Sequence, residues 1–218
     1  MPLLYKKQDS ELLYGIWKVT ESNEELSSFL IHSHFDYTNN RQRIQEKLAV
    51  RVLLKTLLKD EERKIEYYLS GKPYFSDNKW HISISHTKGY VALALHPTSE
   101  IGLDIEQYND RVRRVSSRFI RPDEESTVSK AIELEEIIPS RSNEIYAMLL
   151  HWSAKETIFK IMGEIDVDLL NNMRVYPFDL RQNGTFQAQE LGSTEKQIFQ
   201  IHYFLYPDFV FTYTVSST

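Results

Sequence analysis

The chain has 218 residues, of which 41% are hydrophobic, which is enough apolar material for a core and too much for a disordered chain. Its net charge of −5 gives no global basic field for nucleic acid, and no apolar run approaches the ~20 residues of a membrane span. The absence of cysteine excludes disulfides, thiolate nucleophiles and zinc thiolate sites. The first ten residues lack the apolar stretch of a signal peptide, so we expect a cytoplasmic protein.

The first half of the chain mixes strand-like and helix-like patterns. Strands are predicted at 12–19, 65–69, 82–84, 91–95 and 101–105, where apolar residues run between turn residues. Ser22 and Glu25 have the spacing of a capping box, which predicts a helix to about His32, and apolar spacing predicts a second helix at 40–59. The segment 85–89 is predicted to form a turn between two of the strands.

The second half has more helix and ends in strands. Helices are predicted at 111–119, 122–136 and 144–162, the last stopped by Gly163. Alternating apolar residues predict strands at 199–205 and 209–215. Because strands and helices occur in both halves, with 97–100 between them, we expect an α+β fold. It would have two lobes, residues 1–100 and 101–218, packed side by side with an active site at their junction.

The most informative residues are acids and lysines that follow two of these elements. Asp104 and Glu106 are two apart at the end of a predicted strand, so their side chains leave the same face. Glu156 and Lys160 are four apart on a predicted helix and share one helix face. Two carboxylates about 4 Å apart repel by ~4 kcal/mol at an effective dielectric of 20, and a hard cation such as Mg²⁺ removes that cost. These residues therefore predict a metal site, with a lysine that suits a bound phosphate.

Each motif also has an ordinary structural explanation. The strand acids fit a solvent-facing strand end, and the helical pair fits a solvated helix face. His86 fits either a phosphate contact in the predicted turn or a histidine satisfied locally. Lys72 before Pro73 fits an ordinary turn lysine held in an extended conformation, and the basic face between 41 and 55 fits a solvated surface.

Four runs in this order, at 71–73, 82–86, 101–106 and 152–160, resemble sequence blocks of the 4′-phosphopantetheinyl transferase superfamily. The resemblance spans about residues 40–165. The chain length is similar to that of the long, Sfp-like class, whose single chain holds two similar α+β halves as a pseudo-dimer. No glycine-rich phosphate loop, serine-hydrolase elbow or dinucleotide fingerprint points to another family.

The resemblance implies an enzyme of the holo-[acyl-carrier-protein] synthase type. It would transfer 4′-phosphopantetheine from coenzyme A to a serine of an apo acyl or peptidyl carrier protein and release 3′,5′-ADP. The resemblance implies that Asp104, Glu106 and Glu156 hold Mg²⁺, for which Mn²⁺ is an alternative with similar oxygen ligands. It also implies that Glu156 takes the serine proton and that Lys160 stabilises charge on the phosphates.

The resemblance further implies which residues bind coenzyme A: Lys72, Pro73, Ser85, His86, Arg51, Lys160 and Arg43, for which Arg41 is the alternative. One departure is the gap of 48 positions from Asp104 to Trp152, which is longer than is usual for this class, so we expect a surface loop at 133–142. The arginine run at 111–114, with Arg118 and Arg121, is the candidate surface for an acidic carrier protein. We expect a monomer, because a two-lobed chain needs no partner to complete its cleft.

Two other functions fit some of the same residues. A metal-dependent phosphodiesterase or nuclease also uses two spaced acids and a lysine, but Gln107 follows Glu106, no Glu-x-Lys comes after it, and the chain is acidic. A non-catalytic protein that binds carrier domains would not need intact acids. The sequence therefore predicts the transferase, with no nucleic acid and no membrane among its partners.

Overall fold

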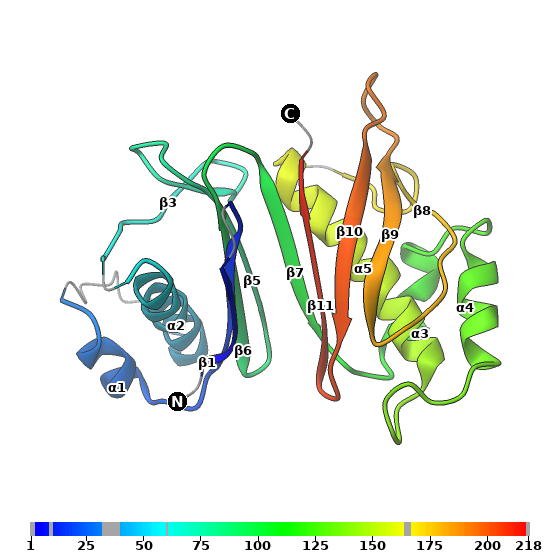
Figure 1. Ribbon diagram of the computed structural model, residues 1–218, viewed down its shortest axis with the longest axis horizontal. Coiled ribbons are helices and arrows are strands. Elements are labelled where there is room, and N and C mark those ends of the chain that lie inside the picture. The colour runs from blue at the N-terminus through cyan, green and yellow to red at the C-terminus, as the bar shows by residue number, and fades with distance from the viewer. Residues whose placement is uncertain (1–2, 9–10, 32–39, 60, 164–166, 217–218) are drawn as a thin grey trace. The chain divides into compact units, whose positions relative to one another are not determined.

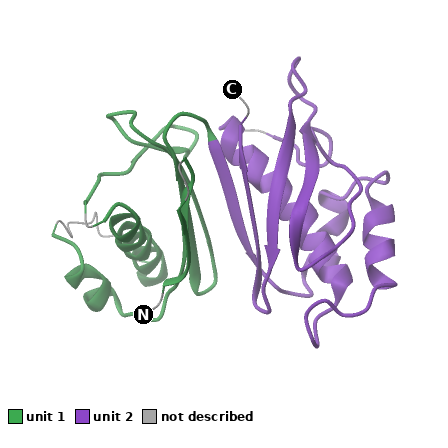
Figure 2. Cartoon of the chain, in the orientation of Figure 1, with its two compact units in different colours: residues 1–100 green, residues 101–218 purple. Residues whose placement is uncertain are grey.

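The computed structural model describes residues 3–8, 11–31, 40–59, 61–163 and 167–216. The chain divides into two compact units, unit 1 (residues 1–100) and unit 2 (residues 101–218), shown in Figure 2. Each unit combines an antiparallel sheet with helices, so the predicted α+β class is confirmed. Within the described ranges, no helix has both the length and the apolar character that a membrane crossing requires.

Unit 1 is a four-stranded sheet with one long helix against it (Figure 1). Its strand order is β1-β2-β6-β5, formed by β1 (Leu3–Gln8), β2 (Leu13–Lys18), β5 (His81–Thr87) and β6 (Tyr90–His96). Helix α2 (Arg41–Leu57) begins at Asn40, whose side chain caps two backbone amides, and packs its leucine-rich face on the sheet. Helix α1 (Asn23–Ser28) begins with the predicted capping box of Ser22 and Glu25. A short hairpin of β3 (Glu66–Tyr67) and β4 (Pro73–Tyr74) completes the unit.

Unit 2 is a five-stranded sheet with the order β7-β11-β10-β9-β8. Its strands are β7 (Ile101–Gln107), β8 (Met173–Val175), β9 (Asn183–Glu190), β10 (Ile198–Leu205) and β11 (Phe209–Val215). Helix α5 (Asn143–Met162) runs along one face of this sheet (Figure 1). Two shorter helices, α3 (Val112–Val115) and α4 (Glu125–Ile132), contact α5. Because α5 has neighbours on several sides, it is buried over most of its circumference.

Helix α5 begins and ends close to the predicted positions. The prediction was 144–162 and the observed helix is Asn143–Met162, ended by Gly163 in the left-handed conformation with φ of 65°. The loop expected within 133–142 contains no helix or strand. The buried side chain of Asn143 accepts from the Ile137 amide and donates to the carbonyls of Leu134 and Glu135, so it satisfies the backbone of that loop.

Other predicted helices are shorter than expected. The segment predicted as a helix at 111–119 is α3 followed by a 3₁₀ turn at Ser116–Arg118. The helix predicted at 122–136 is α4, Glu125–Ile132, because the carbonyls after it bond to Asn143 instead of continuing the helix. Helix α1 ends at Ser28 rather than near His32, which lies outside the described residues.

The turn predicted at 85–89 is shorter in the structure, because β5 continues to Thr87. Ser85, His86 and Thr87 belong to β5, where His86 pairs with Val91 of β6. Only Lys88 and Gly89 form the turn, and Gly89 supplies the positive φ of 80° that such a turn favours. The backbone amides of 85–87 therefore lie in a strand and do not form a phosphate-binding turn.

Candidate active site

Strand β7 and helix α5 approach each other closely in unit 2, and Gly102 permits that approach. A Cβ atom at Gly102 would clash with the backbone carbonyl of Thr157 and lie 3.0 Å from Ile161 Cγ1. Glycine in a strand often marks such a close backbone approach. The contact fixes the distance between the strand that carries the two acids and the helix that carries the third.

Three side chains on α5 face the acids of β7. Trp152, Glu156 and Lys160 are four residues apart and therefore form one stripe on the helix. At one end, Lys160 Nζ lies 2.7 Å from Asp104 Oδ1 and also donates to the Leu103 carbonyl at 3.0 Å. At the other end, Trp152 Nε1 donates to Glu106 Oε1 at 2.9 Å. The strand and helix residues singled out in the sequence thus lie in one cluster.

The acids in this cluster are close enough to affect one another's ionisation. Burial, and then the charge of Asp104, raise the pKa of Glu106 to about 7, while the Trp152 hydrogen bond and Lys160 oppose the shift. Burial and Asp104 also raise the pKa of Glu156 above its ordinary value. Three carboxylates therefore share a partly dehydrated volume in which their negative charges are incompletely balanced.

This donor set suits a hard divalent cation. Carboxylate oxygens are the ligands that such ions prefer, and a cation would offset the burial and the Asp104 charge that raise the pKa values of Glu106 and Glu156. Across the described ranges, however, no three His, Cys, Asp or Glu side chains are already arranged as a metal site. In the structure it is the Lys160 ammonium that contacts Asp104, so the cluster has a cation of its own.

Lys155, although it lies next to Glu156 in the sequence, does not belong to the acidic cluster. Its side chain is fully buried and bonds to Glu124 Oε2 at 2.9 Å and to the Phe119 carbonyl. The other oxygen of Glu124 accepts from the Val175 amide at 2.6 Å. Burial lowers the pKa of Lys155, and the charge of Glu124 opposes that shift. The pair ties α5 to the segment before α4 and to β8.

Trp152 belongs to the apolar stripe of its helix, which by itself predicts only a core residue. Its ring does pack on Phe119 at 5.1 Å, but its indole N–H reaches the Glu106 carboxylate. The signal available in the sequence was the spacing of four residues to Glu156, which places both side chains on one helix face.

The candidate residues of unit 1 come from the β3–β4 hairpin, from β5 and from α2. Lys72 Nζ pairs with Glu100 Oε2 at 2.9 Å, and Lys72 and Pro73 line a small pocket with Tyr74 and Trp80. The other residues lie on β5 and α2 and comprise Ser85, His86, Arg43 and Arg51.

Among that second group, His86 has an acidic neighbour. Ser85 is buried, whereas the side chain of His86 is 55% exposed and its Nδ1 lies 3.6 Å from Glu46 Oε2. Arg43 is exposed and Arg51 half-buried on α2. A phosphate at His86 would therefore meet the carboxylate of Glu46 as well as the imidazole.

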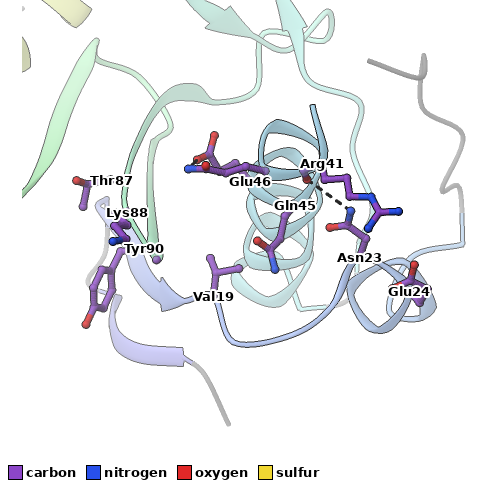
Figure 3. A pocket seen from close by; sticks show the side chains of 11 residues that line it. Val19, Asn23, Glu24, Arg41, Gln45, Glu46, Thr87, Lys88 and Tyr90 are labelled. Atoms are coloured by element: carbon purple, nitrogen blue, oxygen red, sulfur yellow. Dashed lines mark hydrogen bonds between the residues drawn. The ribbon is translucent and has the colours of Figure 1, made fainter. Parts of the chain in front are cut away.

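Glu46 also lines the larger pocket of unit 1, of about 590 Å³. Figure 3 shows side chains from α1, from the first turns of α2 and from the β5–β6 turn around it, including those of Arg41 and Lys88. Arg41, the alternative that the sequence offered to Arg43, lines this pocket, and the other unit 1 candidates do not. Lys88, which also lines the pocket, was not proposed from the sequence.

The fold and the cluster together define an α+β protein whose acids and lysine are suited to phosphate chemistry. A family model described as the 4′-phosphopantetheinyl transferase superfamily matches residues 100–214. The chain therefore belongs to the 4′-phosphopantetheinyl transferase superfamily, and the resemblance seen in its sequence is confirmed at this level. The matched region contains β7, α5 and the whole acidic cluster. No curated protein matches the chain.

Proposed function

We propose that the protein transfers 4′-phosphopantetheine from coenzyme A to a serine of an apo acyl or peptidyl carrier protein, in the manner of the long, Sfp-like class. One observation carries the proposal. Inside the family match, β7 and α5 bring Asp104, Glu106 and Glu156 together with Lys160. Phosphoryl transfer depends mainly on positioning and charge neutralisation, which this set of residues can supply.

Asp104, Glu106 and Glu156 would hold a divalent cation, with Mg²⁺ as the first choice and Mn²⁺ as the alternative. When bound, that cation neutralises charge on the pyrophosphate of coenzyme A. The residues fit this role because burial and the charge of Asp104 raise the pKa values of Glu106 and Glu156, and a bound cation would favour their ionised forms.

The protein's own groups would handle the proton and the developing charge. The serine oxygen forms a bond to the phosphorus that carries the pantetheine arm, and the bond from that phosphorus to the bridging oxygen breaks, which releases 3′,5′-ADP. The serine proton goes to Glu156, directly or through a water molecule. Lys160 Nζ, held at 2.7 Å from Asp104, would stabilise charge on the phosphates.

Unit 1 would supply further contacts to coenzyme A. The family resemblance is the basis for assigning this role to Lys72 and Pro73, to Ser85 and His86, and to the arginines at 43 and 51. Of these, the side chains of Arg43 and His86 are exposed, and we expect the neighbouring Glu46 to modulate a phosphate contact at His86.

The carrier protein would bind to the arginine-rich surface of α3. Arg113 bonds to Glu144, and Arg121 pairs with Asp123, so both are already neutralised. The remaining arginines of α3 and of the segments beside it are exposed, as is Val115 at 37%: Arg111, Arg114 and Arg118. An acidic carrier with an apolar patch would complement this surface.

The proposed function is tested by incubating the protein with coenzyme A, Mg²⁺ and a panel of purified apo carrier proteins. We expect at least one carrier to gain the mass of one phosphopantetheine group, and 3′,5′-ADP to appear in equal amount. If every carrier keeps its apo mass while still binding the protein, the chain is a carrier-binding protein and the proposal is wrong.

A further inference from the structure

The indole of Trp152 makes a hydrogen bond that a purely packing role would not require. Its Nε1 donates to Glu106 Oε1 at 2.9 Å, across 46 positions of the chain and from α5 to β7. Trp152 is the first residue of the helix stripe that continues with Glu156 and Lys160. The donor therefore lies at one end of the acidic cluster and the Lys160 ammonium at the other.

The ring of Trp152 is held firmly, so its N–H is a donor with a fixed direction. It packs edge-on against Phe119, with the centroids 5.1 Å apart and the planes at 71°, and it borders the apolar core of unit 2. A donor fixed in this way restricts the rotation of the carboxylate that accepts from it. One hydrogen bond uses only part of the acceptor capacity of a carboxylate, which has two oxygens and about four lone-pair sites.

The two ends of the cluster differ in charge. Lys160 neutralises Asp104, because an ammonium and a carboxylate form an ion pair at 2.7 Å. The indole is neutral, so it orients Glu106 without cancelling its negative charge. Glu106 thus stays available to a cation while its side chain is held in one direction.

We propose that Trp152 is a positioning residue, whose indole N–H orients Glu106 so that this carboxylate can bind a divalent cation together with Asp104 and Glu156. The inference rests on the proposed function, since it requires a cation at these acids. Hydrogen-bonding partners of metal ligands typically contribute 10–100-fold in metal affinity. An effect of that size is measurable without any turnover.

The test is the affinity of the full chain for Mn²⁺, measured by electron paramagnetic resonance of the free ion, with Trp152→Phe as the variant. Phenylalanine keeps an aromatic ring against Phe119 but lacks the N–H. The matched control is Trp17→Phe, which removes an indole that donates to Glu21 in unit 1. We expect Trp152→Phe to bind Mn²⁺ 10–100-fold more weakly and Trp17→Phe to bind it like the wild type.

A double-mutant cycle shows whether Trp152 acts through Glu106. Once Glu106→Gln has removed the charged ligand, we expect the added Trp152→Phe to change Mn²⁺ affinity by less than about twofold, within the additivity limit. A loss of 10-fold or more in the Glu106→Gln background would mean that Trp152 acts on general packing, and it would overturn the inference.

The wild-type protein gives a second readout that does not depend on a variant folding. In protein labelled with ¹⁵N-tryptophan, titration with Mg²⁺ should shift the indole N–H resonance of Trp152 and leave those of Trp17 and Trp80 in place. If wild type and Trp152→Phe bind Mn²⁺ equally, or if Mg²⁺ binds without moving the Trp152 resonance, the positioning role is wrong and the proposed function stands. If the wild type binds no divalent cation even with coenzyme A present, both are wrong.

Discussion

The contact between Lys160 and Asp104 gives the cluster a built-in cation. The side chain of Asp104 is 3% exposed and that of Lys160 23%, so the pair is largely removed from water. Leaving one partner of a buried pair alone typically costs 3–5 kcal/mol. The ammonium therefore stabilises the metal-free protein by offsetting a buried carboxylate.

Replacing Lys160 with methionine removes this charge while keeping a side chain of similar length. We expect Lys160→Met to lower the free energy of unfolding by about 3 kcal/mol in EDTA, because Asp104 loses its ion-pair partner. Millimolar Mg²⁺ should restore more of this stability in the variant than it adds to the wild type. Thermal unfolding with and without Mg²⁺ measures both effects, with Lys130→Met on the exposed surface of α4 as the control. Equal shifts in the variant and the wild type would contradict the account.

The raised pKa of Glu106 predicts how stability depends on pH. Burial and Asp104 raise this pKa from 4.5 to about 7, so between these values the native state binds more protons than the unfolded state. The free energy of unfolding of the metal-free protein should therefore fall as pH rises from about 4.5 to 7, by up to about 3 kcal/mol.

Urea unfolding in EDTA at pH 5 and pH 8 tests this dependence. The free energy of unfolding of the wild type should be lower at pH 8 than at pH 5, in part because Glu106 ionises. In Glu106→Gln, which cannot ionise at this position, the difference between the two pH values should be smaller. Glu156 contributes with the same sign, since burial raises its pKa as well. An identical pH dependence in the wild type and Glu106→Gln would show that Glu106 titrates normally.

At the scale of elements, the site depends on two segments that the sequence predicts well. The helix expected at 144–162 is observed at Asn143–Met162, because its apolar stripe is long and Gly163 ends it clearly. The strand expected at 101–105 is Ile101–Gln107, extended by the register with β11. With both elements located, the shared faces of the four charged residues follow from the periods of helix and strand.

Elements with weaker signals were missed. Strand β9 has a polar sequence with only Phe186, Ala188 and Glu190 buried, and β1 alternates between half-buried and exposed residues. Such strands form because neighbouring strands provide hydrogen-bond partners, and their own sequences contain no sign of this. The sequence around Lys155 and Trp152 likewise does not show their hydrogen-bond partners, because these partners come from distant segments.

The close approach of β7 and α5 can be tested by adding one methyl group. Gly102→Ala places a Cβ against the Thr157 carbonyl, which belongs to the helix backbone and can yield only if α5 moves. We expect a loss of about 1–3 kcal/mol in stability and weaker Mn²⁺ binding, because the helix acid moves away from the strand acids.

A matched control for this variant is Gly184→Ala in β9. There the new Cβ would meet the ring of Tyr203 at 3.2 Å and no helix backbone. It should leave Mn²⁺ affinity unchanged. If both alanine variants bind Mn²⁺ like the wild type, the spacing of strand and helix does not determine the site.

At the scale of the whole molecule, each unit has its own apolar core, formed only from its own residues. The acidic cluster and the arginine-rich face of α3 both belong to unit 2. In the proposed function, unit 2 thus contains the chemical groups and the carrier-binding surface, and unit 1 contributes to holding coenzyme A.

Reversing the charge of two exposed arginines should separate carrier binding from coenzyme A binding. We expect Arg114→Glu with Arg118→Glu to raise the KM for an acidic carrier about tenfold or more, because repulsion replaces attraction at the surface. The KM for coenzyme A should stay unchanged. Steady-state kinetics with each substrate varied in turn measures both, with Arg181→Glu, an exposed arginine before β9, as the control. An unchanged KM for the carrier would exclude this surface.

In the proposed function the acids of β7 and α5 carry out phosphopantetheine transfer, and the mass of a carrier protein reports that transfer. A susceptible apo carrier is incubated with coenzyme A and Mg²⁺, and its mass is followed over time with the wild type, Asp104→Asn and Glu156→Gln. We expect the wild type to add one phosphopantetheine group per carrier and each variant to do so on the order of 10²–10³ times more slowly. Transfer at the wild-type rate by either variant would contradict the proposed function.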